Sequence, residues 1–278
     1  MISIKNDFDI DSTITCGQIF RYTKENINYT IILKDRVISL TVDNQNINIE
    51  SNNEDNLEEV INDYFDLKRD YKKIEDDIIK MDKNIEQAIL ESHGLHMIHQ
   101  DPFETIISYV ISQNNRVPSI TNSLNLIAQR YGKKIVFKDK EYYLFPSYQD
   151  LKTIKEEEYR ECKVGFRDKY LLGIVESINN KTLDLDKIYD MTSDEALNYL
   201  MSFKGIGNKV ASCILLFAYQ KFDVYPIDTW VKKFMKDDYN IEGLKEIKEF
   251  TVKTYKEYSG LAIQYMFNYK RNKSNLQN

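Results

Sequence analysis

The sequence predicts an α+β protein, in which an N-terminal antiparallel β-sheet lobe with helices precedes a larger helical domain. In the first fifty residues apolar and polar side chains alternate, and from residue 57 the apolar residues recur at helical spacing. Two helix starts with capping signals follow, at residues 101–104 and 192–195. We expect the lobe to span residues 1–92 and the helical domain residues 93–278, with the lobe's helices able to pack against the second domain.

The sheet is expected where the alternation has a period of two. Ile38, Leu40 and Val42 have polar neighbours, as do Ile47 and Ile49, and the turn-like segments KDR and DNQ separate the runs. This pattern is typical of half-buried strands joined by short turns. An antiparallel sheet is therefore predicted here.

The helices are expected from spacing and from caps. Apolar residues recur at helical intervals from Leu57 to Phe65 and again over residues 74–89. Further along, Asp101 can cap a helix that has Pro102 at its first position and Glu104 three residues after the cap. The TSDE segment at residues 192–195 has the same arrangement of a capping residue and an acid three positions later, so a second helix is expected to begin there. Apart from the sheet, the chain is expected to be mostly helical.

Composition limits the classes of protein that fit. Of the 278 residues, 42% are hydrophobic and 29% charged, and no apolar run approaches the length of a membrane helix. The first residues, MISIKNDFDIDS, resemble neither a secretory signal nor a transit peptide, so a cytoplasmic location is expected. The net charge of -6 repels polyanions at long range. Nucleic-acid binding would therefore need locally concentrated cations and backbone amides.

Residues 202–209 join two apolar helical runs by a tight turn that contains Gly205 and Gly207. Glycines there can take positive φ and let another backbone approach, and the amides that begin the second helix favour an anion such as phosphate. An ordinary corner between two helices is the alternative. Lys209 falls in the first turn of the second helix, where the dipole and partial burial would lower its pKa and make it a nucleophile.

The segments GIGNKVA at residues 205–211 and VYPID at residues 224–228 together resemble the helix-hairpin-helix and Gly/Pro/Asp signature of DNA base-excision glycosylases. In that superfamily the resemblance implies that Lys209 attacks C1′ of the damaged nucleotide and that Asp228 is the catalytic acid. It also implies that the second domain is an all-α helix-hairpin-helix glycosylase domain.

Within the superfamily, the chain is most similar to the 8-oxoguanine DNA glycosylases, and the similarity covers nearly its whole length. TCGQIFR at residues 15–21 resembles an N-terminal element of that branch, which implies that the Gly17 carbonyl accepts the N7 hydrogen of 8-oxoguanine. Because N7 is a donor in the oxidised base and an acceptor in guanine, one carbonyl can read the difference. Taken alone, Gly17 would be read as a turn glycine.

Three further residues are assigned to DNA by the same resemblance. QDPFE at residues 100–104 and SQNN at 112–115 match the branch, and Asn114 would occupy the gap that the extruded base leaves. GFRDKY at residues 165–170 implies that Phe166 wedges into the base stack and that Arg167 contacts the orphaned cytosine. Taken singly, Phe166 would more often be a core residue and Arg167 a solvated surface charge.

The base pocket is expected to close on the C-terminal segment SGLAIQYMF at residues 259–267, where Phe267 and Cys213 would sandwich the base. The glutamine that reads the base edge in the family falls at Ile263, and Gln264 lies about 100° further round the helix. A second arginine that contacts the orphan cytosine is replaced by Ser119. We therefore expect a weaker preference for cytosine opposite the lesion.

Metal and cofactor expectations are few. The three histidines of HGLHMIH at residues 93–99 have no cysteine nearby to complete a site, so a loop between domains is favoured over a metal. The superfamily resemblance places a structural cation on the backbone carbonyls of Met201, Phe203 and Ile206. The three cysteines exclude an iron–sulfur cluster of four cysteine ligands, and no cofactor is expected to be required.

The reading that follows is a bifunctional glycosylase and abasic-site lyase of base-excision DNA repair, acting as a monomer on duplex DNA that contains 8-oxoguanine, without a membrane partner. A prokaryotic enzyme that works at the nucleoid is expected. The alternatives are a glycosylase of the same fold for another damaged base, and a non-catalytic helix-hairpin-helix DNA-binding protein.

Overall fold

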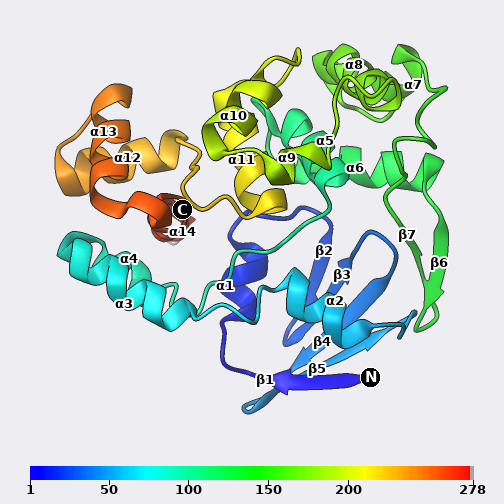
Figure 1. The fold of residues 1–278 in the computed structure, drawn as a ribbon. Coiled ribbons are helices and arrows are strands. Elements are labelled where there is room, and N and C mark those ends of the chain that lie inside the picture. The colour runs from blue at the N-terminus through cyan, green and yellow to red at the C-terminus, as the bar shows by residue number, and fades with distance from the viewer. Residues whose placement is uncertain (276–278) are drawn as a thin grey trace.

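The computed structural model describes residues 1–275, and an antiparallel sheet of five strands lies at its N-terminal end (Figure 1). The strand order is β1-β5-β4-β3-β2, so each neighbouring pair from β2 to β5 is a hairpin and β1 pairs with β5. Ile38 and Leu40 are fully buried and pair across to Ser51 and Ile49 of β5. The sheet predicted from the alternating pattern is confirmed. Its strands are β1 Ile2–Lys5, β2 Tyr22–Glu25, β3 Asn28–Ile32, β4 Val37–Val42 and β5 Asn46–Ser51.

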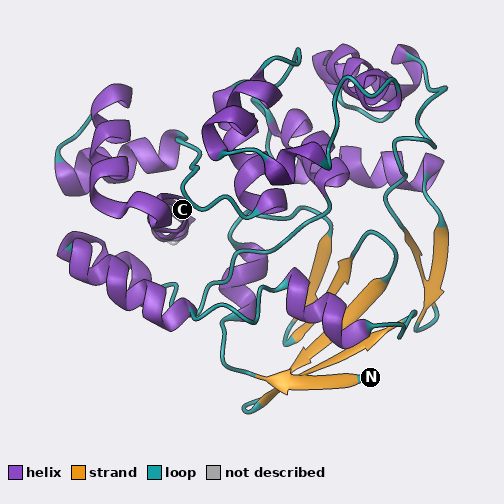
Figure 2. Cartoon of the chain, in the orientation of Figure 1, coloured by secondary structure: helices purple, strands orange, loops and turns teal. Residues whose placement is uncertain are grey.

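Helices make up most of the remaining chain (Figure 2). The predicted caps are present: the Asp101 side chain accepts the Glu104 amide, and Thr192 forms a capping box with Glu195. Within the described residues, no helix is both long and apolar enough to cross a membrane. The helices are α1 Ile10–Thr15, α2 Leu57–Tyr64, α3 Tyr71–Met81, α4 Glu86–Leu90, α5 Pro102–Ser112, α6 Val117–Tyr131, α7 Glu156–Glu161, α8 Asp168–Asn179, α9 Lys187–Asp190, α10 Ser193–Met201, α11 Asn208–Tyr219, α12 Thr229–Tyr239, α13 Leu244–Tyr255 and α14 Ser259–Asn275, with short 3₁₀ turns η1 Lys83–Ile85, η2 Gly165–Arg167 and η3 Lys256–Tyr258.

The buried apolar residues form two clusters. The smaller one lies between the sheet, α1 and α2, and includes Phe65. The larger one fills the helical part and takes in Ile74, Ile78 and Ile89 from α3 and α4. These two helices precede residue 92 in the sequence but pack with the helices that follow it.

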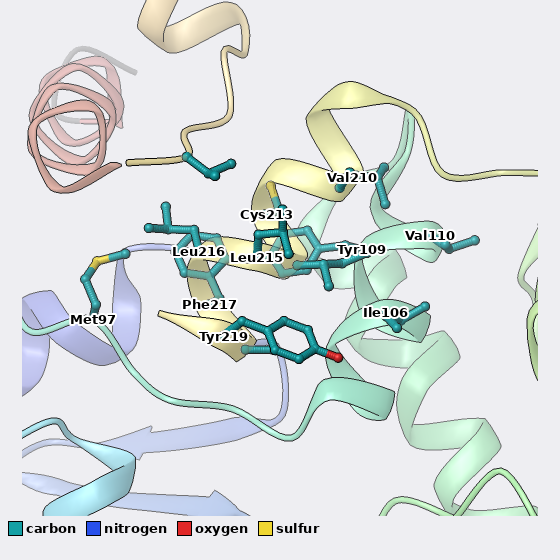
Figure 3. Packing of buried hydrophobic residues seen from close by; sticks show 14 of the residues in the cluster. Met97, Ile106, Tyr109, Val110, Val210, Cys213, Leu215, Leu216, Phe217 and Tyr219 are labelled. Carbon is teal, nitrogen blue, oxygen red and sulfur yellow. The ribbon is translucent and has the colours of Figure 1, made fainter. Parts of the chain in front are cut away.

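Helix α11 runs through the centre of the larger cluster. Every residue from Val210 to Tyr219 is buried, as expected for a helix that is apolar all round. It packs along α5, where the rings of Tyr109 and Phe217 stack 5.5 Å apart (Figure 3). After its first two residues, the helix that begins at the glycine turn is therefore buried along its whole length.

One element departs from the expectation that the second domain is helical throughout. Strands β6 Lys134–Phe137 and β7 Lys140–Tyr143 form a hairpin after α6. Its turn residues Lys138 and Asp139 have φ of 50° and 58°. Two positive φ values are typical of the tight type I′ turn, whose usual sequence signal is Asn-Gly. Because this turn has Lys-Asp instead, the sequence did not indicate the hairpin. The hairpin's Lys138 also forms an ion pair of 2.5 Å with Glu50 of the sheet.

Candidate active site

A cavity of about 600 Å³ opens between the loop after α1, the end of α5, the start of α11, the segment before α12, and α14. Its wall brings together most of the residues that the sequence assigned to catalysis and to the base. The lining includes Gly17, Asn114, Lys209, Cys213, Asp228, Ile263, Gln264 and Phe267. Residues far apart in the sequence thus meet around one space of a size that can hold a purine.

The turn between α10 and α11 uses its two glycines differently. Gly205 has φ of +95°, and a Cβ there would lie 2.6 Å from the Tyr170 side chain. Gly207 has φ of -90° and caps α11, and a Cβ there would meet nothing within 4 Å. Of the two glycines, which could both take positive φ, only Gly205 does so. Gly207, Asn208 and Lys209 are all exposed, so the start of α11 is open to solvent, as an anion site requires.

Lys209 lies in the first turn of α11 and lines the cavity. It is exposed, so the partial burial expected from the sequence is absent. Its positive charge nevertheless acts on two neighbours, because it opposes the rise in the pKa of both Cys213, one turn further along α11, and Asp228. Lys209 is thus placed where an incoming nucleotide would reach it.

Asp228 caps helix α12 with its carboxylate. One oxygen, Oδ1, accepts the amide hydrogens of both Trp230 and Val231 at 2.9 Å. Burial raises the pKa of this carboxyl above its usual value, and the two amides and Lys209 oppose the rise. The cap fixes the carboxylate in the cavity wall, where its charge faces Lys209.

The predicted base-binding residues form two sides of the cavity. Gly17 has φ of +89°, and a Cβ there would lie 3.5 Å from the Phe267 ring. Cys213 faces the same space from α11, and burial raises the pKa of its thiol to about 12. The sulfur therefore stays protonated at neutral pH and offers a polarisable, uncharged surface. Cys213 and Phe267 thus present a sulfur and an aromatic ring to the same cavity.

Helix α14 brings both Ile263 and Gln264 to the cavity. The Gln264 amide Nε2 donates a bond of 3.1 Å to the carbonyl of Cys16, next to Gly17. The glutamine is therefore displaced round the helix, as expected, but it still reaches the loop that carries Gly17. Ile263 is buried and presents only carbon atoms at the position of the family glutamine.

The three residues assigned to DNA lie at the mouth of the cavity and beyond it. Asn114 is exposed, with φ of 47°. Phe166 is 59% exposed in η2, as a wedge residue must be. Arg167 is only 6% exposed, and its guanidinium donates to the carbonyls of Gln113, Asn114 and Val164. These bonds use four of the five N–H groups of the guanidinium, and within the described residues one N–H on Nη1 is left that could meet an orphan base.

The other predicted groups are structural or stay predictions. In the hairpin the Phe203 carbonyl accepts the Ile206 amide at 3.1 Å, and the cation expected on the carbonyls of Met201, Phe203 and Ile206 remains a prediction. The three histidines diverge: His93 bonds Glu75, His96 bonds the Phe65 carbonyl, and His99 bonds Asp63. No group of metal-binding side chains forms among the described residues.

Two residues of the site were missed from the sequence. Tyr109 donates its hydroxyl to the carbonyl of Gly17, and Arg271 lies over the Phe267 ring at 5.3 Å. Tyr109 is hidden in the apolar run of α5, where a tyrosine looks like core. Arg271 could have been found, because it is four residues after Phe267 and so on the same side of a helix.

Comparisons with known proteins agree with this arrangement. Residues 1–106 match the family model of the 8-oxoguanine DNA glycosylase N-terminal domain. A probable N-glycosylase/DNA lyase of Methanothermobacter thermautotrophicus is 30% identical over 77% of this chain and 75% of its own. The N-glycosylase/DNA lyase of Saccharomyces cerevisiae is 28% identical, over 93% of this chain and 75% of its own.

Among solved structures, the Clostridium acetobutylicum 8-oxoguanine glycosylase/lyase in complex with duplex DNA containing cytosine opposite 8-oxoguanine superposes with a TM-score of 0.92. The two chains are 34% identical, and 99% of each is covered. The 3-methyladenine DNA glycosylase of Archaeoglobus fulgidus, 20% identical with a TM-score of 0.80, shares the fold.

The fold, with a lysine at a helix-hairpin-helix turn and an aspartate across the cavity, is that of a helix-hairpin-helix DNA glycosylase. Within this class the chain belongs to the 8-oxoguanine DNA glycosylase family.

Proposed function

We propose that this protein removes 8-oxoguanine from duplex DNA and then cleaves the strand as an abasic-site lyase. The observation that carries the proposal is the meeting of Lys209, Asp228, Cys213 and Phe267 around one cavity. A nucleophile and a carboxylate face the place where a sugar would sit, and a ring and a sulfur face the place of a base. Family membership supports the same substrate and reaction.

Lys209 is the nucleophile. The Lys209 ammonium first loses a proton to solvent, and the neutral amine then attacks C1′. The C1′–N9 bond breaks with its electron pair on the purine, which afterwards takes up a proton, and the new amine loses a proton to solvent. Opening of the sugar ring, with protonation of O4′, gives an iminium ion between Lys209 and C1′. That ion acidifies the C2′ hydrogens, so loss of one of them expels the 3′ phosphate by β-elimination.

Asp228 stabilises the positive charge that develops on the sugar and on the Lys209 nitrogen. Such a group acts best when it is fixed before the reaction, since no reorganisation is then needed. The two amide bonds to Oδ1 fix it in this way. Burial supports the role because a charge is screened less in a partly desolvated wall than in water.

Gly17 discriminates the oxidised base, and the hairpin holds the DNA. The Gly17 carbonyl accepts N7–H, which guanine lacks, so guanine would leave two acceptors facing each other. The uncovered amides after Gly207 bind a backbone phosphate. Phe166 enters the stack and Asn114 fills the gap while the nucleotide is rotated out, at a cost of a few kcal/mol. A cation on the hairpin carbonyls would hold the turn in shape, and no cofactor is needed for the chemistry.

The test is borohydride trapping on a duplex with a single 8-oxoguanine. Wild-type protein and a Lys204→Gln control, which removes an exposed lysine of the same turn, should give a covalent product, and Lys209→Gln should give none. Persistent trapping by Lys209→Gln would sink the assignment of the nucleophile. Binding of the duplex without release of base or strand cleavage would point instead to a non-catalytic DNA-binding protein.

A further inference from the structure

Arg271 is a charged group in the wall of the base cavity that the proposed reaction does not use. It lies in α14 one turn after Phe267, and its guanidinium covers the Phe267 ring at 5.3 Å. Nη1 lies 3.2 Å from the place where a Cβ on Gly17 would be. Helical side chains lean toward the N-terminus of their helix, which brings Arg271 back over Phe267 and Gly17.

The guanidinium has hydrogen-bonding capacity left over. Nη2 donates to the Thr15 carbonyl at 2.5 Å and to Asn268 Oδ1 at 3.2 Å. Nε is buried without a partner, and the ion pairs found within residues 1–275 include none to Arg271. Its charge is therefore balanced only by neutral oxygens, whereas arginines in protein walls usually face a carboxylate or an anionic ligand.

The neighbouring groups indicate which part of a base would meet this charge. In 8-oxoguanine, N7–H is flanked by two carbonyl oxygens, O6 and O8. If the Gly17 carbonyl accepts N7–H, one of these oxygens comes to lie beside Gly17, where Arg271 Nη1 is. At the same time Ile263, eight residues earlier on the same side of α14, presents no donor to the base.

We propose that Arg271 reads the flipped base by donating a hydrogen bond to the carbonyl oxygen beside N7, O6 or O8, and stabilises the base as it departs. The inference rests on the proposed function. When the C1′–N9 bond breaks, the electron pair stays on the purine and the negative charge spreads onto its carbonyl oxygens. A guanidinium already in place strengthens its bond as that charge develops, so it lowers the barrier as well as binding the ground state.

The experiment separates reading of the base from chemistry at the sugar. Arg271→Met, Arg271→Lys and a control Lys273→Met, which removes an exposed charge of the same helix, are compared with the wild type. Each is given a duplex with 8-oxoguanine, one with 8-oxoadenine and one with a preformed abasic site. Single-turnover release is measured on the lesions and borohydride trapping on the abasic site, where no base occupies the cavity.

Arg271→Met should slow 8-oxoguanine release at least about tenfold, the loss expected for one charge-assisted hydrogen bond, while trapping on the abasic site stays near that of the wild type. Arg271→Lys should recover part of the rate, and Lys273→Met should behave as wild type. Equal slowing on both lesions assigns the contact to O8, which both contain. A narrowed preference for 8-oxoguanine over 8-oxoadenine assigns it to O6, which 8-oxoadenine replaces with an amino group.

Unchanged release of 8-oxoguanine by Arg271→Met would overturn the inference. A parallel loss of base release and of abasic-site trapping would also overturn it, because that result would mean that Arg271 has a purely structural role. A wild-type protein that traps on the abasic site yet does not release 8-oxoguanine is a distinguishable result that overturns the proposed substrate and this inference with it.

Discussion

The hydroxyl of Tyr109 donates a hydrogen bond of 3.1 Å to the carbonyl oxygen of Gly17. The same hydroxyl lies 3.2 Å from the Gln18 carbonyl, so one buried phenol ties down the loop that is proposed to distinguish the oxidised base. Burial raises the pKa of Tyr109 well above its usual value, which keeps the hydroxyl protonated and able to donate. The carbonyl proposed to read the lesion is thus positioned by a side chain from another element.

Tyr109→Phe should therefore weaken selection of the lesion more than folding. Loss of one hydrogen bond is worth about 1 kcal/mol, which corresponds to roughly fivefold less discrimination between 8-oxoguanine and guanine. Competition between the two bases at a fixed position measures this ratio. A matched control is Tyr219→Phe, which removes another buried hydroxyl bonded to a carbonyl, that of Leu185, outside the cavity. Equal effects of the two substitutions would contradict the role of Tyr109.

Alanine at the two hairpin glycines should affect different properties, stability at Gly205 and DNA affinity at Gly207. Gly205→Ala is expected to lower the free energy of unfolding by about 1–3 kcal/mol, because its φ of +95° is strained for alanine and Tyr170 occupies the space. Gly207→Ala meets no protein atom, so its stability should stay within about 1 kcal/mol of the wild type while affinity for duplex DNA falls. Denaturant unfolding and DNA titration check the pair. Unchanged affinity of Gly207→Ala would argue against a phosphate at this turn.

Two substitutions of Asp228 should separate its cap from its charge. Asparagine keeps an oxygen that can accept the Trp230 and Val231 amides, so Asp228→Asn should fold as the wild type. Asp228→Ala loses the cap and should be about 0.5–2 kcal/mol less stable. Both should lose base release in a single-turnover assay. Activity retained in Asp228→Asn would show that the charge is not required.

The raised pKa of Asp228 predicts a pH dependence with a definite sign. Base release is proposed to need the carboxylate form of Asp228. The rate of release should therefore fall as the pH drops through the folded pKa of Asp228, and this pKa lies above that of an exposed aspartate. In the window between the unfolded and folded pKa, the folded protein binds more protons. The contribution of Asp228 to the free energy of unfolding should therefore fall as the pH rises through that window. Urea unfolding of the wild type and of Asp228→Asn across the acid range isolates this contribution as the difference between the two proteins, because both share the other carboxyl groups.

Local signals in the sequence predicted the elements well, and the placement of side chains less well. The caps at Asp101 and Thr192 depend on residues three positions away, so the sequence contains all that is needed. Arg167 illustrates the opposite case: its partner is the carbonyl of Gln113, 54 residues earlier. Which atoms a guanidinium meets depends on how distant segments come together, and one sequence does not state this.

The cavity itself shows the same limit. Lys209, Asp228 and Phe267 were assigned through resemblance, and the structure brings them to one space. Periodicity gave no sign of Tyr109 as a tether, because a tyrosine in an apolar run has the same pattern as any core residue. Nor did the sequence show that Lys209 is exposed, because the exposure of a side chain depends on which distant segments pack against it.

The bond from Gln264 to the Cys16 carbonyl joins residues 248 positions apart, and Arg271 reaches Thr15 in the same way. Both bonds join the loop that carries Gly17 to helix α14, so the side of the cavity proposed to inspect the base depends on a contact between segments far apart in the sequence. Lys209 and Asp228 come from other elements, the first turn of α11 and the cap of α12. Detachment of α14 would therefore remove the surface proposed to inspect the base without removing the lysine or the aspartate.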